Sequence, residues 1–200
     1  MSDVLVERCF GQFLDPIPPS HEFLTLNFSL NPTPRINRWR NYGLSADFLG
    51  DYFAAFFPGD QLDSSPINRR DAVKASISYI ANELLENAIK FSDTSIGLPA
   101  SITLYLYEDS IIFEVTNPTH PSTAEQYQQF IETLLKADLA SLYLEQLEKN
   151  AMGGDSSNMG LLTILNDYET HLGWRFTPIN SHKETIHSCV KVSVMARIAV

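Results

Sequence analysis

The chain is poor in positive charge, and this shortage restricts its partners. Of its 200 residues, 14 are Lys or Arg and 24 are Asp or Glu, which gives a formal net charge of −10 at pH 7. A nucleic-acid backbone or an anionic membrane surface binds clustered cations, so the composition argues against both as the main partner. A nucleotide stays compatible with this composition, because its phosphates need only one or two cations and a metal ion.

Cysteines and long apolar runs are also scarce. Cys9 and Cys189 are the two cysteines and form no CxxC motif, so neither a disulfide framework nor a zinc site is expected. The first ten residues carry Asp3 and Glu7 and lack the basic and apolar regions of a signal peptide. No segment approaches the ~20 apolar residues that span a bilayer. These absences predict a cytoplasmic protein with neither a membrane nor a nucleic acid as partner.

The length predicts one domain over residues 21–200, preceded by a short N-terminal segment. Residues 1–20 contain three prolines near their end, and we expect an arm that binds a partner or a strand added to the sheet. Period-2 alternation and β-rich composition predict strands at 23–30, 101–107, 111–116, 173–178 and 186–196. Helical spacing of apolar residues predicts helices at 45–57, 69–92, 124–150 and 160–169. This order favours an α+β fold, a two-layer sandwich with helices on one face of a mixed, mostly antiparallel sheet.

The helix at 69–92 carries the residues best suited to chemistry. Glu83, Asn87 and Lys90 fall within roughly 60° of one another on its surface, beside the apolar stripe that must face the sheet. An amide oxygen together with phosphates can hold magnesium, a carboxylate one turn away can act as a base, and an ammonium can neutralise phosphate. The alternative is a solvated helix face, in which Glu86 and Lys90 form an ordinary i,i+4 pair.

The segment at 82–92, NELLENAIKFS, resembles the N-box of the GHKL ATPase superfamily. This group includes the ATP-binding domains of histidine kinases, anti-sigma-factor serine kinases, type II topoisomerase ATPase subunits and heat-shock chaperones. The resemblance implies a Bergerat-type ATP-binding fold. It also implies that Asn87 binds magnesium and nucleotide, that Glu83 is the general base or orients it, that Lys90 contacts phosphate, and that Phe91 lies beside the adenine.

Two later segments resemble the same superfamily less closely. Asn117 stands where the superfamily has an Asp that accepts a hydrogen bond from the adenine amino group, although Asn117 and Pro118 could simply end a strand. Gly160 and Leu161 match the end of a glycine-rich segment whose helix-terminal amides meet the phosphates. Asn158 replaces the first glycine of that segment, and a loop followed by an ordinary helix start is the alternative.

The same resemblance implies further details outside the N-box. The loop at 153–158 would be a flexible lid, and Ser188 is a weak candidate for a hydroxyl that supports the adenine pocket. Residues 35–40 form one basic and aromatic patch, which is either a solvated connector or a protein contact.

The size of the chain resembles that of stand-alone members, the anti-sigma-factor serine kinases and regulators of bacterial partner switching. This resemblance implies ATP or ADP and Mg²⁺ as cofactors and a protein partner, which would be a STAS-like antagonist phosphorylated on serine, a sigma factor or another regulator. A homodimer is a further possibility. Two alternatives stay open: a protein-binding module of the same fold that binds nucleotide weakly or not at all, and an unrelated α+β domain.

Overall fold

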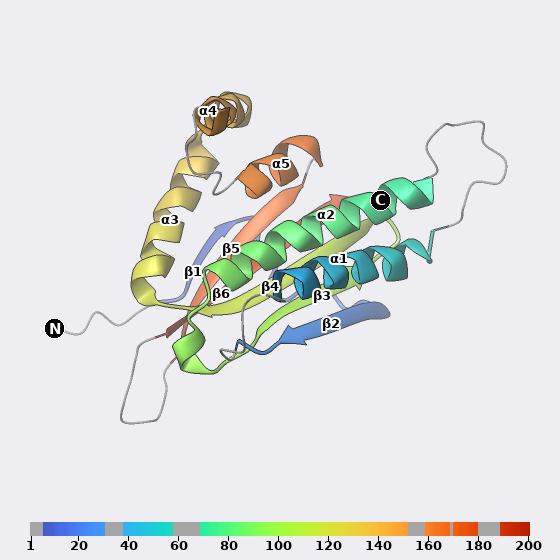
Figure 1. Cartoon of the computed structure of the whole chain (residues 1–200), viewed down its shortest axis with the longest axis horizontal. Coiled ribbons are helices and arrows are strands. Elements are labelled where there is room, and N and C mark those ends of the chain that lie inside the picture. Colours follow the sequence, from blue (N-terminus) through green and yellow to red (C-terminus); the bar gives the residue numbers. More distant parts are fainter. Residues whose placement is uncertain (1–5, 31–37, 58–68, 152–158, 169, 180–188) are drawn as a thin grey trace.

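A computed structural model of the chain describes residues 6–30, 38–57, 69–151, 159–168, 170–179 and 189–200 (Figure 1). Its six strands form one sheet in the order β1-β5-β6-β4-β3-β2, and every neighbouring pair is antiparallel. The strands are β1 (Arg8–Gly11), β2 (Glu22–Phe28), β3 (Ala100–Leu106), β4 (Ser110–Thr119), β5 (His171–Ile179) and β6 (Cys189–Ala199). The helices are α1 (Arg38–Ala54), α2 (Arg69–Lys90), α3 (Pro121–Lys136), α4 (Leu139–Ala151) and α5 (Met159–Asp167).

The helices cover one face of the sheet, which confirms the predicted two-layer α+β sandwich (Figure 1). Helix α2 lies over the middle of the sheet. It buries five residues of the apolar stripe that helical spacing predicts, and the sixth, Phe91, follows the helix. The five are Val73, Ile77, Ile80, Leu84 and Ala88. The stripe packs against strand residues such as Ile102 and Phe113, both fully buried. Burial of each large aliphatic side chain stabilises the fold by about 1.5–3 kcal/mol, so this layer contact fixes the position of α2 on the sheet.

Strand β4 runs past the Asn117-Pro118 pair, so the prediction that this pair ends the strand is wrong. Residues up to Thr119 pair with β6, whereas β3 pairs with β4 only as far as Thr116. The carbonyl of Pro118 accepts a hydrogen bond from the Asp93 amide at 2.9 Å, so this residue faces away from β6. In a strand, the N–H of a residue points to the same side as its carbonyl, which for Pro118 is the side away from β6. Proline has no N–H, but at this position no hydrogen bond between β4 and β6 is lost.

The predicted helix at 124–150 is two helices, α3 and α4, with a break between them. Ala137 has extended backbone angles of φ −81° and ψ 154°, which end α3. The Asp138 carboxylate accepts hydrogen bonds from the backbone N–H of Ser141 at 3.1 Å and from its hydroxyl at 2.6 Å. These bonds satisfy the start of α4 in the manner of a helix N-cap, so the chain turns at this point.

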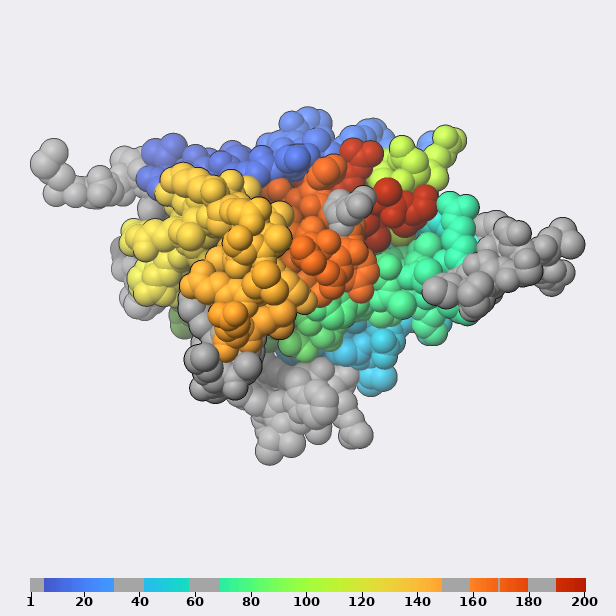
Figure 2. Space-filling model, turned by 90° about the horizontal axis from the view of Figure 1, so that it is seen from above, coloured from blue at the N-terminus to red at the C-terminus, as the bar shows by residue number. Residues whose placement is uncertain are grey.

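The N-terminal segment adds a strand to the sheet, one of the two possibilities that the sequence leaves open. Strand β1 pairs with β5 at one edge of the sheet, whereas β2 lies at the opposite edge. Residues 12–20, here called the strap, therefore cross the sheet on the face away from the helices. The hydroxyl of Tyr107 donates to the carbonyl of Pro18 at 2.6 Å and fixes the far end of the strap. In Figure 2 the N-terminal residues form a blue band on the side of the molecule opposite α1 and α2.

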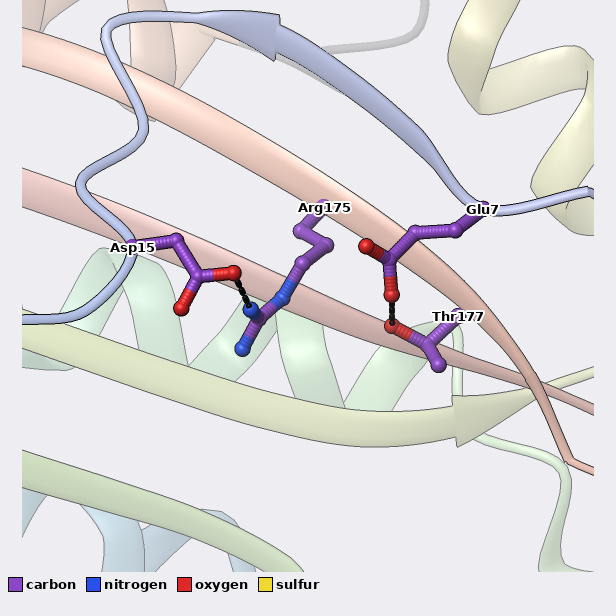
Figure 3. A network of polar contacts seen from close by, with 4 residues as sticks. All are labelled: Glu7, Asp15, Arg175 and Thr177. Atoms are coloured by element: carbon purple, nitrogen blue, oxygen red, sulfur yellow. Dashed lines mark hydrogen bonds and ion pairs between the residues drawn. The ribbon is translucent and has the colours of Figure 1, made fainter.

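The near end of the strap is held by charged and aromatic contacts (Figure 3). The guanidinium of Arg175 pairs with the Asp15 carboxylate at 2.6 Å and lies 4.7 Å from the centre of the Phe13 ring. Just before β1, on the same face of the sheet, the Glu7 carboxylate accepts a hydrogen bond from the Thr177 hydroxyl at 3.0 Å. The strap shields the face that bears Ser193 and Met195, so both are buried although no helix covers them.

Candidate functional site

A pocket opens between the end of α2, the sheet and two of the later helices. Its cavity has a volume of about 20 Å³, which is room for about one water molecule. The elements α2, β4, α3, α5 and β6 contribute the lining. The lining residues are Leu84, Asn87, Ala88, Phe91, Asn117, Thr119, Thr123, Ala124, Tyr127, Leu161, Val192 and Val194.

Four residues that the resemblance marks as nucleotide ligands line this one pocket. Asn87 and Phe91 come from α2 and its end, Asn117 from β4, and Leu161 from α5. They are separated by up to 74 positions in the sequence and meet because α5 packs against α2, which lies on the sheet beside β4. The four residues thus lie together, while their roles as nucleotide ligands stay predictions.

Glu83 lies beside the pocket and packs directly on the start of α5. A Cβ atom added to Gly160 would lie 1.8 Å from Oε2 of Glu83, so only a glycine leaves room for the carboxylate. Burial raises the pKa of Glu83, and the nearby negative charge of Glu86 raises it further. No hydrogen bond to the Glu83 carboxylate comes from the residues that the structure describes. Glu83 is thus a partly desolvated carboxylate one helical turn from Asn87, at the edge of the pocket.

Lys90 lies at the same end of α2 and is exposed. Its ammonium nitrogen is 5.4 Å from the centre of the Phe91 ring, on which it forms a cation–π contact. Neither Lys90 nor Gly160 lines the pocket. Lys90 contacts Phe91 and Gly160 directly precedes Leu161, and both of these neighbours line it. The positive charge therefore lies at the rim, where a phosphate would be more accessible than in the cavity.

The two asparagine amides differ in their surroundings. Asn117 is buried, and its Nδ2 is 3.5 Å from the carbonyl oxygen of Pro118. Asn87 is half-buried, and within the described ranges its side-chain amide has no hydrogen-bond partner. An open amide oxygen next to a carboxylate suits magnesium, which takes few protein ligands and completes its shell with water and phosphate. Among the described residues there is no group of three or more His, Cys, Asp or Glu that could hold a metal ion.

Helix α3 contributes residues that sequence reasoning missed. Thr123, Ala124 and Tyr127 close the pocket on the side away from α2. The Tyr127 ring stacks on Phe91 with 6.3 Å between ring centres, and burial raises the pKa of its phenol. No motif marks these residues, and only the helical spacing of Ala124, Tyr127 and Ile131 indicates that this side of α3 faces the protein.

The pocket is narrower than a nucleotide needs. A purine ring is far larger than one water molecule, so adenine can enter only if α3 or the side chains of Phe91 and Tyr127 move outward. The hydroxyl of Thr119 donates to the carbonyl of Phe91 at 2.6 Å and ties the end of α2 to β4. This bond fixes the backbone at the end of α2 and leaves the Phe91 ring free to turn.

Some of the predicted features lie outside the described residues. These are the lid at 153–158 with Asn158, Ser188, and the side chains of the basic and aromatic patch at 35–40. Within the part of the chain that the structure describes, no helix is both long and apolar enough to cross a membrane.

The comparisons with known proteins support the fold. The sequence matches no protein-family model and no curated protein. The structure is similar to a chain in the crystal structure of the SiaB–SiaC complex from Pseudomonas aeruginosa, with a TM-score of 0.52 and 15% sequence identity. The match covers 88% of this chain and 89% of the other. At this level of identity the likeness shows a shared fold over nearly the whole length of both chains.

Proposed function

We propose that the protein is an ATP- and Mg²⁺-binding regulator of a bacterial partner-switching pathway and that it acts as a serine kinase on a STAS-like antagonist protein. One observation carries the proposal: Asn87, Phe91, Asn117 and Leu161, selected from the sequence by resemblance to one ATPase superfamily, line the same pocket. A helix that only mimicked the N-box would not bring the β4 and α5 residues of the same resemblance to it.

The residues around the pocket suit phosphoryl transfer. The Asn87 amide oxygen would hold a magnesium ion, which would supply charge neutralisation for the phosphates of a bound nucleotide. Lys90 at the rim would pair with phosphate, and the N–H groups at the start of α5 would donate to it. The Glu83 carboxylate would accept the proton of the attacking serine hydroxyl, as the serine oxygen bonds to the γ-phosphorus and ADP leaves. Its raised pKa favours this role, because a carboxylate with a higher pKa is a stronger base.

A protein partner agrees with the charge and with the structural likeness. The net charge of −10 disfavours polyanions, so a small acceptor protein fits better than a nucleic acid. The similar solved structure is a complex of two proteins, SiaB and SiaC. We infer that this chain also works by binding another protein.

A second candidate function is a protein-binding module that holds nucleotide weakly or not at all. It is favoured by the cavity volume of about 20 Å³ and by the neutral Asn117 where an ATP-binding relative would have an acidic residue. In this case the pocket would be a closed remnant of the nucleotide site, and regulation would depend on protein contacts alone.

Calorimetric titration with ATP and ADP, each with and without magnesium, separates these functions. The kinase proposal expects ATP to bind with magnesium, and expects Asn87→Ala to remove the magnesium dependence. Asn166→Ala, an exposed asparagine of α5, is the matched control and should bind as the wild type does. Absence of binding at millimolar nucleotide would reject the kinase and leave the binding module.

Transfer is tested next with labelled ATP and a candidate antagonist. Glu83→Ala should abolish transfer and largely spare nucleotide affinity. If this variant transfers phosphate as fast as the wild type, Glu83 is not the base.

A further inference from the structure

A larger cavity lies at the end of α3 that is distant from the candidate nucleotide pocket. Its volume is about 220 Å³, against about 20 Å³ for the nucleotide pocket. Its walls come from the end of α3, the start of α4, α5, the start of β5 and the residues where β1 ends. In Figure 1 these helices lie on the β1 and β5 side of α2. Walls on so many sides form a pocket for a small molecule, whereas a helix or a strand needs an open groove. We call this pocket the second cavity.

The deep walls of the second cavity are apolar. Leu134, Leu172 and Trp174 line it and are buried, and Leu165 adds an apolar side chain from α5. A water molecule needs two to four polar partners, so walls of this kind hydrate poorly. An engineered cavity of about 150 Å³ with similar lining stays dry and binds benzene. The second cavity is larger and has room for a ring with a small substituent.

The second cavity also reaches the protein surface. Leu135 lines it although its side chain is 51% exposed. Gln12 and His171 line it from the other side and are exposed as well. These residues therefore form a mouth, through which a ligand can enter from solvent while its ring lies against the buried walls.

The charges around the second cavity favour a neutral ligand. Among the described residues that line it there is no Asp, Glu, Lys or Arg. A charged group that entered would lose its water without gaining an opposite charge, and this desolvation is strongly unfavourable. Carboxylic acids, amines and phosphates are therefore poor ligands for the interior of this cavity.

One side chain of the second cavity can give a neutral ligand its orientation. Thr170 lines the cavity and is buried, with 5% of its surface exposed. Its hydroxyl lies 3.5 Å from the carbonyl oxygen of Tyr168, which is long beside the usual hydroxyl hydrogen bond of about 2.7–2.8 Å. A buried hydroxyl with so weak a partner gains a hydrogen bond when a ligand brings a polar group to it.

Trp174 connects the second cavity with the nucleotide pocket. It lines the second cavity, and its indole N–H donates a hydrogen bond to Tyr127, which lines the nucleotide pocket and stacks on Phe91. The structure therefore combines an open second cavity with a narrow nucleotide pocket. A ligand favours the arrangement that it binds best, so a molecule that fills the second cavity stabilises this one. Outward movement of Tyr127 with α3 would disturb the wall that Trp174 forms.

We propose that the second cavity is a regulatory site for a neutral one-ring aromatic molecule with a single hydrogen-bonding group, and that its occupation opposes opening of the nucleotide pocket. The ring packs between the leucine walls and the Trp174 indole, and the polar group binds the Thr170 hydroxyl. The effect on nucleotide rests on the proposed function, whereas binding of the aromatic molecule does not depend on it.

Fluorescence titration of the full chain tests the ligand site without any nucleotide. In a Trp39→Phe background Trp174 is the single tryptophan, and its emission, excited where benzyl alcohol does not absorb, reports contact with the ligand. Benzyl alcohol should bind with a Kd below about 1 mM, an ordinary affinity for a molecule of its size. Benzoate has a similar size but is charged at neutral pH, and it should bind at least about 10-fold more weakly. Unchanged emission up to about 10 mM benzyl alcohol, or equal affinity for benzoate, would overturn the proposal.

Two threonine variants locate the bound molecule. Thr170→Val removes the hydroxyl and keeps the shape, so benzyl alcohol should bind about 3- to 10-fold more weakly. Toluene, which has no polar group, should bind to this variant as it does to the wild type. Thr123→Val makes the same change in the nucleotide pocket and should not alter the affinity for benzyl alcohol. Equal effects of the two variants, or weaker binding of toluene to Thr170→Val, would overturn the assignment of the ligand to the second cavity.

Competition with nucleotide tests the regulation. With saturating benzyl alcohol, ATP with magnesium should bind at least about 5-fold more weakly, and saturating ATP should weaken benzyl alcohol by the same factor, because coupling between two sites is reciprocal. Benzoate at the same concentration is the control and should leave the ATP affinity unchanged. An ATP affinity that bound benzyl alcohol does not change would overturn the regulatory role. A protein that binds benzyl alcohol and no ATP would reject the proposed function, and the regulation with it, while the ligand site stands.

Discussion

The indole Nε1 of Trp174 donates a hydrogen bond to the phenolic oxygen of Tyr127 at 2.9 Å. Trp174 lies in β5 and is completely buried, whereas Tyr127 lies in α3 and lines the candidate nucleotide pocket. Trp174 also lines a second cavity of about 220 Å³ between the end of α3, the start of α4 and the first residues of β5. This hydrogen bond therefore anchors the middle of α3 to the sheet, between a cavity at each end of the helix.

Removing the Tyr127 hydroxyl should destabilise the protein. In Tyr127→Phe the buried Trp174 N–H loses its acceptor, and an unpaired buried donor costs about 1–3 kcal/mol. Urea unfolding at neutral pH should show a loss of this size. Tyr143→Phe, a half-buried tyrosine of α4 whose hydroxyl has no hydrogen bond within the described residues, should change stability by less than about 0.5 kcal/mol. Equal stability of the two variants would mean that the hydrogen bond contributes nothing measurable.

Two glycines of α1 should respond in opposite ways to alanine. A Cβ at Gly50 would lie 2.1 Å from the Ser78 hydroxyl and 2.9 Å from the Lys74 carbonyl oxygen, so Gly50→Ala must push α1 away from α2. Overpacking of this kind costs about 1–3 kcal/mol, more than the gain in helix propensity of about 1 kcal/mol. At Gly43 the nearest atom is 4.0 Å from the added Cβ, so Gly43→Ala should be neutral or slightly stabilising. Chemical denaturation of both variants measures the contrast, and a Gly50→Ala protein as stable as the wild type would rule out the close packing.

The sequence predicted the parts of the fold that depend on periodicity. The apolar stripe of α2 and the strands other than β1 were predictable because burial of a face imposes a period of 3.6 or 2. Strand β4 was predicted too short because a proline is normally disfavoured in a sheet, and only the tertiary contact between Asp93 and Pro118 makes it harmless. The break before Asp138 was missed because the apolar spacing continues across it and the cap depends on one side chain.

Only the site residues that belong to a sequence motif could be predicted. The N-box resemblance indicated Asn87 and Phe91, and both line the pocket, while Glu83 and Lys90 lie beside it. Tyr127 and Thr123 could not be found in this way, because their part in the pocket follows from where α3 crosses the sheet. These two residues line the pocket through contacts with residues distant in the sequence, and no local sequence pattern indicates such contacts.

The raised pKa of Glu83 makes a prediction about stability and pH. Because burial and the charge of Glu86 raise its pKa, the folded state holds this proton more tightly than the unfolded chain does. The resulting stability is present below the unfolded pKa and is lost as the pH rises through the folded pKa. Glu83→Gln should therefore be more stable than the wild type at about pH 7.5, and this advantage should shrink as the pH falls toward about 4.5.

Urea unfolding across that pH range measures the effect. Glu125→Gln, which removes an exposed carboxylate from α3, is the control and should not show the same gain at about pH 7.5. A Glu83→Gln protein that is no more stable than the wild type at the higher pH would contradict the desolvation of this carboxylate.

The attachment of the strap to β5 should depend on Arg175. Its guanidinium contacts both the Asp15 carboxylate and the Phe13 ring, and each contact is worth up to about 1 kcal/mol at partly exposed sites. In Arg175→Ala the Gln12 amide, which donates to the Leu172 carbonyl at 2.8 Å, should therefore exchange with solvent about 3- to 10-fold faster, because local opening at this end of the strap becomes easier. Asp15→Asn should have a smaller effect, since the contact between Arg175 and Phe13 is kept.

Hydrogen exchange followed by mass spectrometry resolves this segment from the rest of the chain. Arg69→Ala is the matched control, because Arg69 is an exposed arginine at the start of α2, on the face of the sheet away from the strap. Its strap should exchange at the wild-type rate. Unchanged exchange in Arg175→Ala would mean that the strap is held by its far end alone, through Tyr107 and Pro18. Faster exchange throughout the sheet, in place of the strap alone, would instead make Arg175 a determinant of global stability.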